Sequence, residues 1–197
     1  MIKDLLIGLD ARNELVEWKL RSDETLMDSF GEAEWKRIFS DISDIHRLNK
    51  FLNYDCGQCY VAYNLKTNQP FGFIYAYIED EKSKKVSLHG GGWISGNTLL
   101  NYNAYILLID AMLEKGIKVR TACQLDNDIA MRFNRSIGFI KYYSSKNYHY
   151  LWISKERLHK SKIYKRINKK EAAENPIKSR RQIKIILSWQ ISALMAA

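Results

Sequence analysis

The sequence predicts an α/β protein built on one mixed sheet, with helices on both faces. Two observations lead to this class. First, strand-like alternation of apolar and polar residues recurs at 60–65, 71–78 and 86–94, which predicts an antiparallel meander. Second, a long apolar helical segment at 98–115 is followed by another alternating run at 117–125. A strand–helix–strand unit joins parallel strands through a right-handed crossover, so a parallel pair is expected beside the meander.

The elements around this unit follow from local patterns. Residues 15–21 predict a first strand, and residues 32–51 predict a helix because their apolar residues recur at near-helical spacing. The stretches 66–70 and 79–84 are polar or charged and predict the turns between the meander strands. The helix at 98–115 is expected to be buried, since its polar residues form only a narrow stripe, namely Asn103, Asp110 and Glu114.

The helix predicted next is the most informative part of the chain. Asp126 or Asn127 can cap it by accepting hydrogen bonds from the N–H groups of its first turn. Its apolar face recurs at i, i+4 and i+8, with Ile129, Phe133 and Ile137. Gly138 is placed where a left-handed residue ends many helices. A last pair of strands is predicted at 139–143 and 148–153.

The pattern Asn-x-x-Ala-x-Arg-Phe-x-x-x-x-Gly-Phe at 127–139 resembles the cofactor-side signature of the GNAT superfamily, the acyl-CoA-dependent N-acyltransferases. The order of elements from about Leu15 to Ser154 resembles the fold of that family, in which two central parallel strands splay apart. The resemblance implies an enzyme that moves an acyl group, acetyl by default, from acetyl-CoA to an unidentified amine. It implies a small-molecule or peptide amine as acceptor and no metal.

The resemblance also implies where the cofactor binds. In the family, the splayed strand and the loop after it contact the pantetheine arm and the pyrophosphate of coenzyme A. That loop falls at 96–101 here, where Leu99 and Asn101 replace the expected glycines. Backbone N–H groups at the start of the next helix would still face the phosphates. The implied cofactor-binding residues are Trp93, Ile94, Ser95, Gly96, Asn97, Thr98, Asn101, Asn127, Ala130 and Phe133.

Acyl transfer to an amine needs a base for the amine and an acid for the leaving thiolate. The family acid is a tyrosine of the signature helix, and its position here is Asn134, whose amide is not a suitable proton donor. Tyr142 is the candidate substitute because it follows closely in the sequence. His89 lies on the predicted central strand and is the candidate base, since histidine titrates near neutral pH. A purely structural histidine is the alternative.

These departures leave a second function open. The chain is alternatively a catalytically inactive GNAT-fold binding module, associated with nucleic acid through a basic tail. The loop at 96–101 and Asn134 favour this alternative, whereas the intact signature helix favours the enzyme.

The charge pattern predicts two parts. The whole chain has a formal net charge of +9. Residues 1–154 contain 19 basic and 19 acidic residues, and residues 155–197 contain 12 and 3. We therefore expect a GNAT-like acyltransferase domain at 1–154 and a basic C-terminal tail at 155–197, solvated and open to weak polyanion contact. Its apolar end at 183–194 is expected to dock on the core or on a second copy in a homodimer.

The remaining features place the protein in the cytoplasm. No apolar run approaches the ~20 residues of a membrane span, and the apolar run at 5–9 is too short for a secretion signal. The three cysteines, Cys56, Cys59 and Cys123, are expected to be reduced thiols. The CxxC spacing of the first two is interpreted as a strand start rather than a redox or zinc site.

Overall fold

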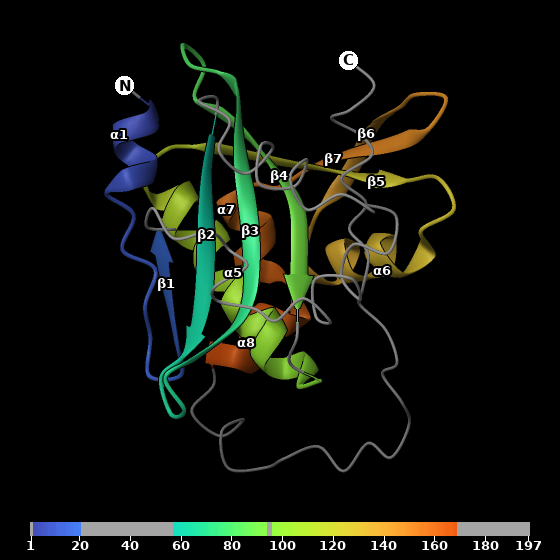
Figure 1. Cartoon of the computed structure of the whole chain (residues 1–197). Helices are drawn as coiled ribbons and strands as arrows, with labels where there is room; N and C mark the ends of the chain where they lie inside the picture. The colour runs from blue at the N-terminus through green and yellow to red at the C-terminus, as the bar shows by residue number, and fades with distance from the viewer. Residues whose placement is uncertain (1, 21–56, 94–95, 169–197) are drawn as a thin grey trace, which may run out of the picture.

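The computed structural model describes residues 2–20, 57–93 and 96–168. It contains a seven-stranded sheet in the order β1-β2-β3-β4-β5-β7-β6 (Figure 1). The strands are β1 (Val16–Leu20), β2 (Gly57–Asn64), β3 (Gln69–Asp80), β4 (Lys85–Trp93), β5 (Lys118–Gln124), β6 (Ile140–Ser144) and β7 (Tyr148–Trp152). Every strand expected from alternation is present, while the helix expected at 32–51 lies outside the described residues.

The sheet is mixed, as predicted. Strands β1 to β4 form the antiparallel meander. Strands β4 and β5 are parallel, and Leu88 pairs directly with Thr121. Strand β5 then pairs antiparallel with β7, and β7 with the edge strand β6. The α/β class and the parallel pair inferred from the apolar helix are therefore confirmed.

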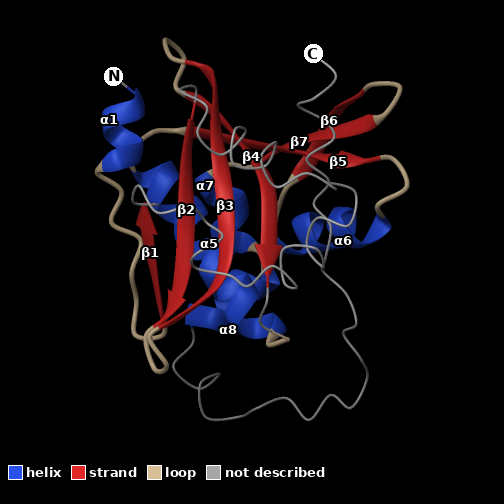
Figure 2. Cartoon of the chain, viewed as in Figure 1, coloured by secondary structure: helices blue, strands red, loops and turns tan. Residues whose placement is uncertain are grey.

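The described helices all pack on one face of the sheet (Figure 2), and the helical layer predicted for the other face is not among the described elements. They are α1 (Ile2–Ile7), α5 (Thr98–Glu114), α6 (Asp128–Ile137), α7 (Lys155–Lys160) and α8 (Lys162–Asn168). Helix α5 crosses between β4 and β5 and buries most of its surface, including Tyr105, Leu108 and Ile109. No helix within the described ranges combines the length and the apolarity that a bilayer crossing requires.

Two elements differ from the sequence expectation. Helix α1 was not expected, and it buries Ile2 and Leu6 beside β2, where the Tyr60 hydroxyl donates to the Leu6 carbonyl oxygen at 2.6 Å. The start of the predicted tail is also folded, because α7 and α8 pack against α5. Leu158 of α7 is fully buried in the core. The folded layer therefore continues past the predicted boundary at Ser154 to Asn168.

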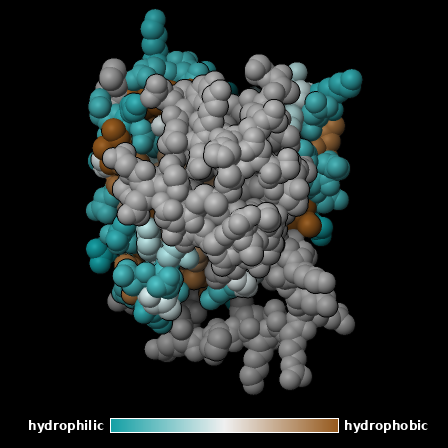
Figure 3. Space-filling model, in the orientation of Figure 1, coloured by the Kyte–Doolittle hydropathy of each residue, from teal (hydrophilic) through white to brown (hydrophobic). Residues whose placement is uncertain are grey.

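The described residues that are visible in Figure 3 are mainly hydrophilic. In the view of Figure 3, strongly hydrophobic residues reach this surface only as separate small spots. Isolated apolar residues of this kind are normal on a folded protein and need no binding partner.

Candidate active site

The parallel strands β4 and β5 separate at the position where the family resemblance expects a splay. Their pairing begins at Lys85 with Lys118 and ends at Leu88 with Thr121. Both strands continue, but among the described residues β4 then pairs with β3 alone and β5 with β7 alone. The strands diverge from this point, as Figure 1 shows. We call the region in which residues 89–93 of β4 and residues 122–124 of β5 no longer pair with each other the wedge.

Helix α5 begins just beyond the wedge. The Asn97 side chain caps it by accepting from the Leu100 N–H at 3.2 Å. The N–H groups of Thr98 and Leu99 precede the first backbone N–H that donates within the helix, that of Asn101 to the Asn97 carbonyl oxygen, so they point out of the helix end. The first turn, from Thr98 to Asn101, is uncharged. Gly96 is exposed, and a Cβ atom on it would meet open space.

Helix α6 lies beside α5 and is capped as predicted. The Asn127 side chain accepts from the Ala130 N–H at 2.9 Å. Gly138 ends the helix with φ at 116°, in the left-handed region. Phe133 is buried and stacks on Tyr102 of α5, with ring centroids 4.4 Å apart. The two helices that start at the wedge are thus joined by aromatic packing.

A hydroxyl pair beside this stack was not found from the sequence. Ser136 and Tyr102 are joined by a hydrogen bond of 2.9 Å between their hydroxyl oxygens. The Ser136 hydroxyl also lies 2.7 Å from the Phe133 carbonyl oxygen. Because a hydroxyl has one proton, Ser136 donates to only one of them. No local pattern marks Tyr102, since its role depends on how α5 packs against α6.

Asn134, at the position of the family acid, is completely buried. Its Nδ2 donates to the Ala130 carbonyl oxygen at 2.9 Å and to Cys123 Sγ at 3.2 Å. Its Oδ1 has no hydrogen-bond partner among the described residues. Burial raises the pKa of the Cys123 thiol to about 11, although the hydrogen bond from Asn134 opposes this shift. Asn134 therefore connects α6 to a protonated thiol on β5.

The other two predicted catalytic residues lie on strands β4 and β6. His89 pairs with Tyr75 and directly follows Leu88, so its backbone lies at the opening of the wedge. Tyr142 lies on β6, two strands away from β5. Its ring contacts the Arg120 guanidinium at 5.0 Å, and burial is the main cause that raises the pKa of its hydroxyl.

The predicted cofactor-binding residues fall into three environments. Trp93 is buried in the core between Trp18, Phe71 and Tyr105, and its Nε1 has no hydrogen-bond partner in the described part. Asn101, Ala130 and Phe133 are buried at the adjoining helices. Gly96 and Asn97 are exposed, and Thr98 and Asn127 are half-buried. Ile94 and Ser95 lie outside the described residues.

Comparison with known proteins supports the fold. No protein-family model matches the chain, and a search of curated proteins gave no match. Among solved structures, apo FdhC, a nucleotide-linked sugar GNAT, is 14% identical with a TM-score of 0.60, over 76% of this chain and 92% of that one. The N-acetyltransferase PseH from Campylobacter jejuni in complex with acetyl coenzyme A is 15% identical, with a TM-score of 0.52 over 72% and 99%.

A third similar structure is the ribosomal-protein-S5-alanine acetyltransferase from Vibrio fischeri. It is 12% identical, with a TM-score of 0.54 over 76% of this chain and 99% of that one. At such low identity the similarity concerns the fold alone. The chain has the fold of the GNAT N-acetyltransferases, as its signature helix predicted.

Proposed function

We propose that this protein is an N-acyltransferase that uses acyl-CoA, with acetyl as the acyl group, to modify an amine. The observation that supports the proposal most is the wedge, where β4 and β5 diverge between the starts of α5 and α6. One of the similar solved structures is a nucleotide-linked sugar GNAT and another is a ribosomal-protein-S5-alanine acetyltransferase, so the fold leaves the acceptor open.

The residues present fit acyl-CoA at the wedge. The uncharged turn from Thr98 to Asn101 offers outward N–H groups and the positive end of a 17-residue helix, which favour phosphate groups. Exposed Gly96 leaves space for a close approach. The pantetheine arm would lie along residues 89–93, where β4 has left β5.

The reaction requires one bond exchange and one net proton transfer. The amine nitrogen forms a bond to the acyl carbonyl carbon while the carbon–sulfur bond breaks, and the amine loses a proton as the thiolate gains one. We propose His89 as the base, since its backbone lies at the opening of the wedge. Asn134 is buried and donates to Ala130 and Cys123, so we assign it a positioning role. Most of the acceleration then comes from holding amine and thioester together.

A binding measurement tests the proposal. Acetyl-CoA added at millimolar concentration should raise the melting temperature of the full-length protein, because a ligand that binds only the folded state stabilises it. Asn97→Asp keeps a capping oxygen but sets a negative charge against the phosphates. We expect it to weaken binding by roughly 1–2 kcal/mol, or about 5- to 30-fold in Kd.

Asn64→Asp is the matched control. Asn64 caps the β2–β3 turn by accepting from the Lys66 N–H, away from the wedge, and aspartate can accept in the same way. This variant should bind acetyl-CoA like the wild type. Wild-type protein that does not respond to acetyl-CoA would refute the proposed function, and equal weakening in both variants would refute the placement at α5.

A further inference from the structure

Five aromatic side chains lie on the face of the sheet that points away from the described helices. We call this set the aromatic platform, and it consists of Tyr142, Tyr143, Tyr148, Tyr150 and Trp152. The strand register places them there. Cys123 and Leu151 belong to the core under the helices, so their neighbours in β5 and β7 point to the opposite face. These neighbours include Tyr150 and Trp152.

A β-bulge enlarges the platform. The pairing of β6 with β7 shifts by one residue between Lys141 and Tyr143. Tyr142 and Tyr143 therefore both face this side. The rings of Tyr143 and Tyr150 lie 5.6 Å apart between their centroids, and the Tyr142 ring packs against the Arg120 guanidinium. Tyr142 and Tyr143 remain 46% and 58% exposed, and Trp152 38%. Exposed rings on adjacent strands are surfaces on which flat ligand rings stack.

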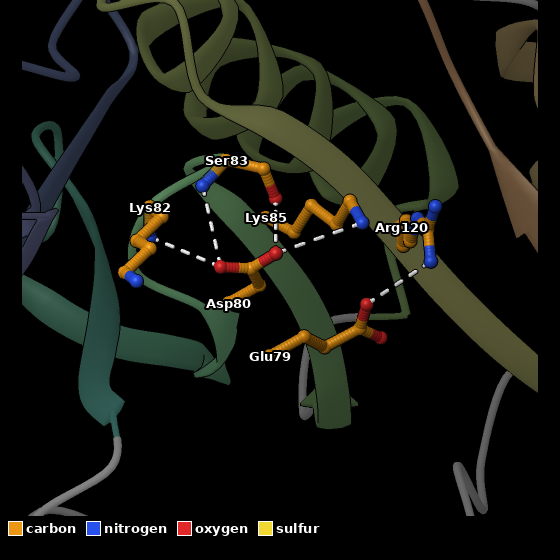
Figure 4. A network of polar contacts seen from close by, with 6 residues as sticks. All are labelled: Glu79, Asp80, Lys82, Ser83, Lys85 and Arg120. Carbon is orange, nitrogen blue, oxygen red and sulfur yellow. Dashed lines mark hydrogen bonds and ion pairs between the residues drawn. The ribbon is translucent and has the colours of Figure 1, made fainter.

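One end of the platform is basic. Arg120 pairs with Trp152 across the ladder, and Lys118 precedes it on the same face of β5. Glu79 holds the Arg120 guanidinium at 3.3 Å, while Asp80 bonds to Lys85 and to the Ser83 hydroxyl (Figure 4). Glu79 and Asp80 thus hold the side chains of Arg120 and Lys85 in place. Side chains of this type recognise phosphate groups.

The other end of the platform reaches the wedge. Tyr148 pairs with Gln124, the last residue of β5. On the opposite side of Gln124 lies the opening left by β4, which has diverged from β5 beyond Leu88. A ligand that covers the platform from Trp152 to Tyr148 therefore extends from a cationic surface to the proposed reaction centre.

We propose that the aromatic platform binds the nucleotide part of the acceptor, an amine carried on a nucleotide, a role that rests on the proposed acyl transfer. The base stacks on the tyrosines, the phosphates lie near Lys118 and Arg120, and the amine points into the wedge. There its nitrogen forms the amide bond as the thioester carbon–sulfur bond breaks, and its proton goes to the thiolate.

Size and charge favour a nucleotide over other ligands with rings. From Tyr148 to Trp152 the platform covers four strand steps, or about 14 Å. That length suits one base with its phosphates better than a single strand, which needs about 4–16 nucleotides of contact. A neutral sugar or an apolar peptide would leave Lys118, which forms no ion pair within the described part of the chain, without a partner of opposite charge, whereas Arg120 already pairs with Glu79.

The test measures nucleotide binding without acyl-CoA. Uridine diphosphate, adenosine diphosphate, uridine and inorganic diphosphate are titrated into full-length protein by calorimetry. We expect at least one nucleoside diphosphate to bind more tightly than either uridine or diphosphate. Trp152→Leu and Tyr150→Ala should each weaken it by roughly 5- to 150-fold, the range measured for loss of a base–aromatic stack. Arg120→Gln should weaken the binding of the nucleoside diphosphate but leave the binding of uridine unchanged.

Tyr63→Ala is the matched control. Tyr63 lies on β2, toward the other edge of the sheet, and has Lys19 over its ring at 4.9 Å, as Tyr142 has Arg120. This variant should bind nucleotides like the wild type. Equal losses in the control, diphosphate binding as tight as a nucleotide, or tighter binding of a thymidine oligonucleotide would each overturn the inference.

The same samples separate this inference from the proposed function. A melting-temperature rise with acetyl-CoA but no nucleotide binding at millimolar concentration would refute the platform alone. Nucleotide binding that depends on Trp152 and Tyr150, without any response to acetyl-CoA, would refute the acyl transfer and with it the acceptor role.

Discussion

Asn134→Asp is the sharpest test of the structure at the position of the family acid. The substitution keeps the shape of the side chain but replaces the amide with a carboxyl group. Both groups that Asn134 donates to, the Ala130 carbonyl oxygen and Cys123 Sγ, are acceptors. A carboxylate at this fully buried site would face the Ala130 carbonyl oxygen, which cannot donate to it, and the Cys123 thiol, which is only a weak donor.

The loss in the free energy of unfolding of Asn134→Asp follows from proton linkage. Burial without a cation raises the pKa of a carboxyl group by as much as 3–5 units, so the folded variant retains a proton that the unfolded chain loses above a pH of about 4. Stability therefore decreases as the pH rises above that value, by about 1.4 kcal/mol for each pH unit, until the folded-state pKa is reached. With about three units between pH 4 and 7, the loss at neutral pH is about 4 kcal/mol, a large part of the stability of an ordinary domain.

The assay is urea unfolding of wild type and variant at several pH values. We expect the free energies of unfolding to be similar in acid and to diverge as the pH rises. Asn127→Asp is the control on the same helix, because aspartate can also cap α6 and its charge suits the helix start. If Asn134→Asp matches the wild type at neutral pH, the side chain reaches water, and its assignment as a buried connection to β5 is wrong.

Two further predictions concern how the helices are held. Gly138→Ala should destabilise the protein by at least about 2 kcal/mol in urea unfolding, since φ is 116° and the new Cβ would lie 2.8 Å from the Arg157 carbonyl oxygen; unchanged stability would contradict this backbone geometry. Tyr164→Phe removes the hydroxyl that donates to Asp110 at 3.1 Å and should cost about 1 kcal/mol. Because burial and Asp110 raise the pKa of Tyr164 to about 12, this difference should be constant around neutral pH and should fall only above the free phenol value of about 10. A difference that already changes near neutral pH would show that another group controls this contact.

The sequence by itself determined the features that depend on neighbours in the chain. Alternation and helical spacing located the described strands, and the apolar helix after 86–94 required a parallel pair, which the structure shows at Leu88 and Thr121. The cap at Asn127 and the stop at Gly138 were readable because a helix end is satisfied by residues within a few positions.

Charge counting did not locate the end of the folded layer. The segment after Ser154 is basic, which is as typical of the exposed face of a helix as of a solvated tail. One apolar residue, Leu158, fixes α7 against the core, and a single apolar position among charges gives no periodic signal. Only packing against α5 shows that this segment belongs to the fold.

The tertiary structure alone decided what the candidate site contains. The pairing of β4 with β5 stops at Leu88, after which β4 stays with β3 and β5 with β7; the family resemblance predicted such a splay, but only the assembled sheet shows the residue at which it begins. Asn134 turns toward Cys123 rather than into the wedge through the rotation of α6 against β5. The bulge that places Tyr142 beside Tyr143 is a property of strand register, which depends on both partners and therefore appears only when the sheet is assembled.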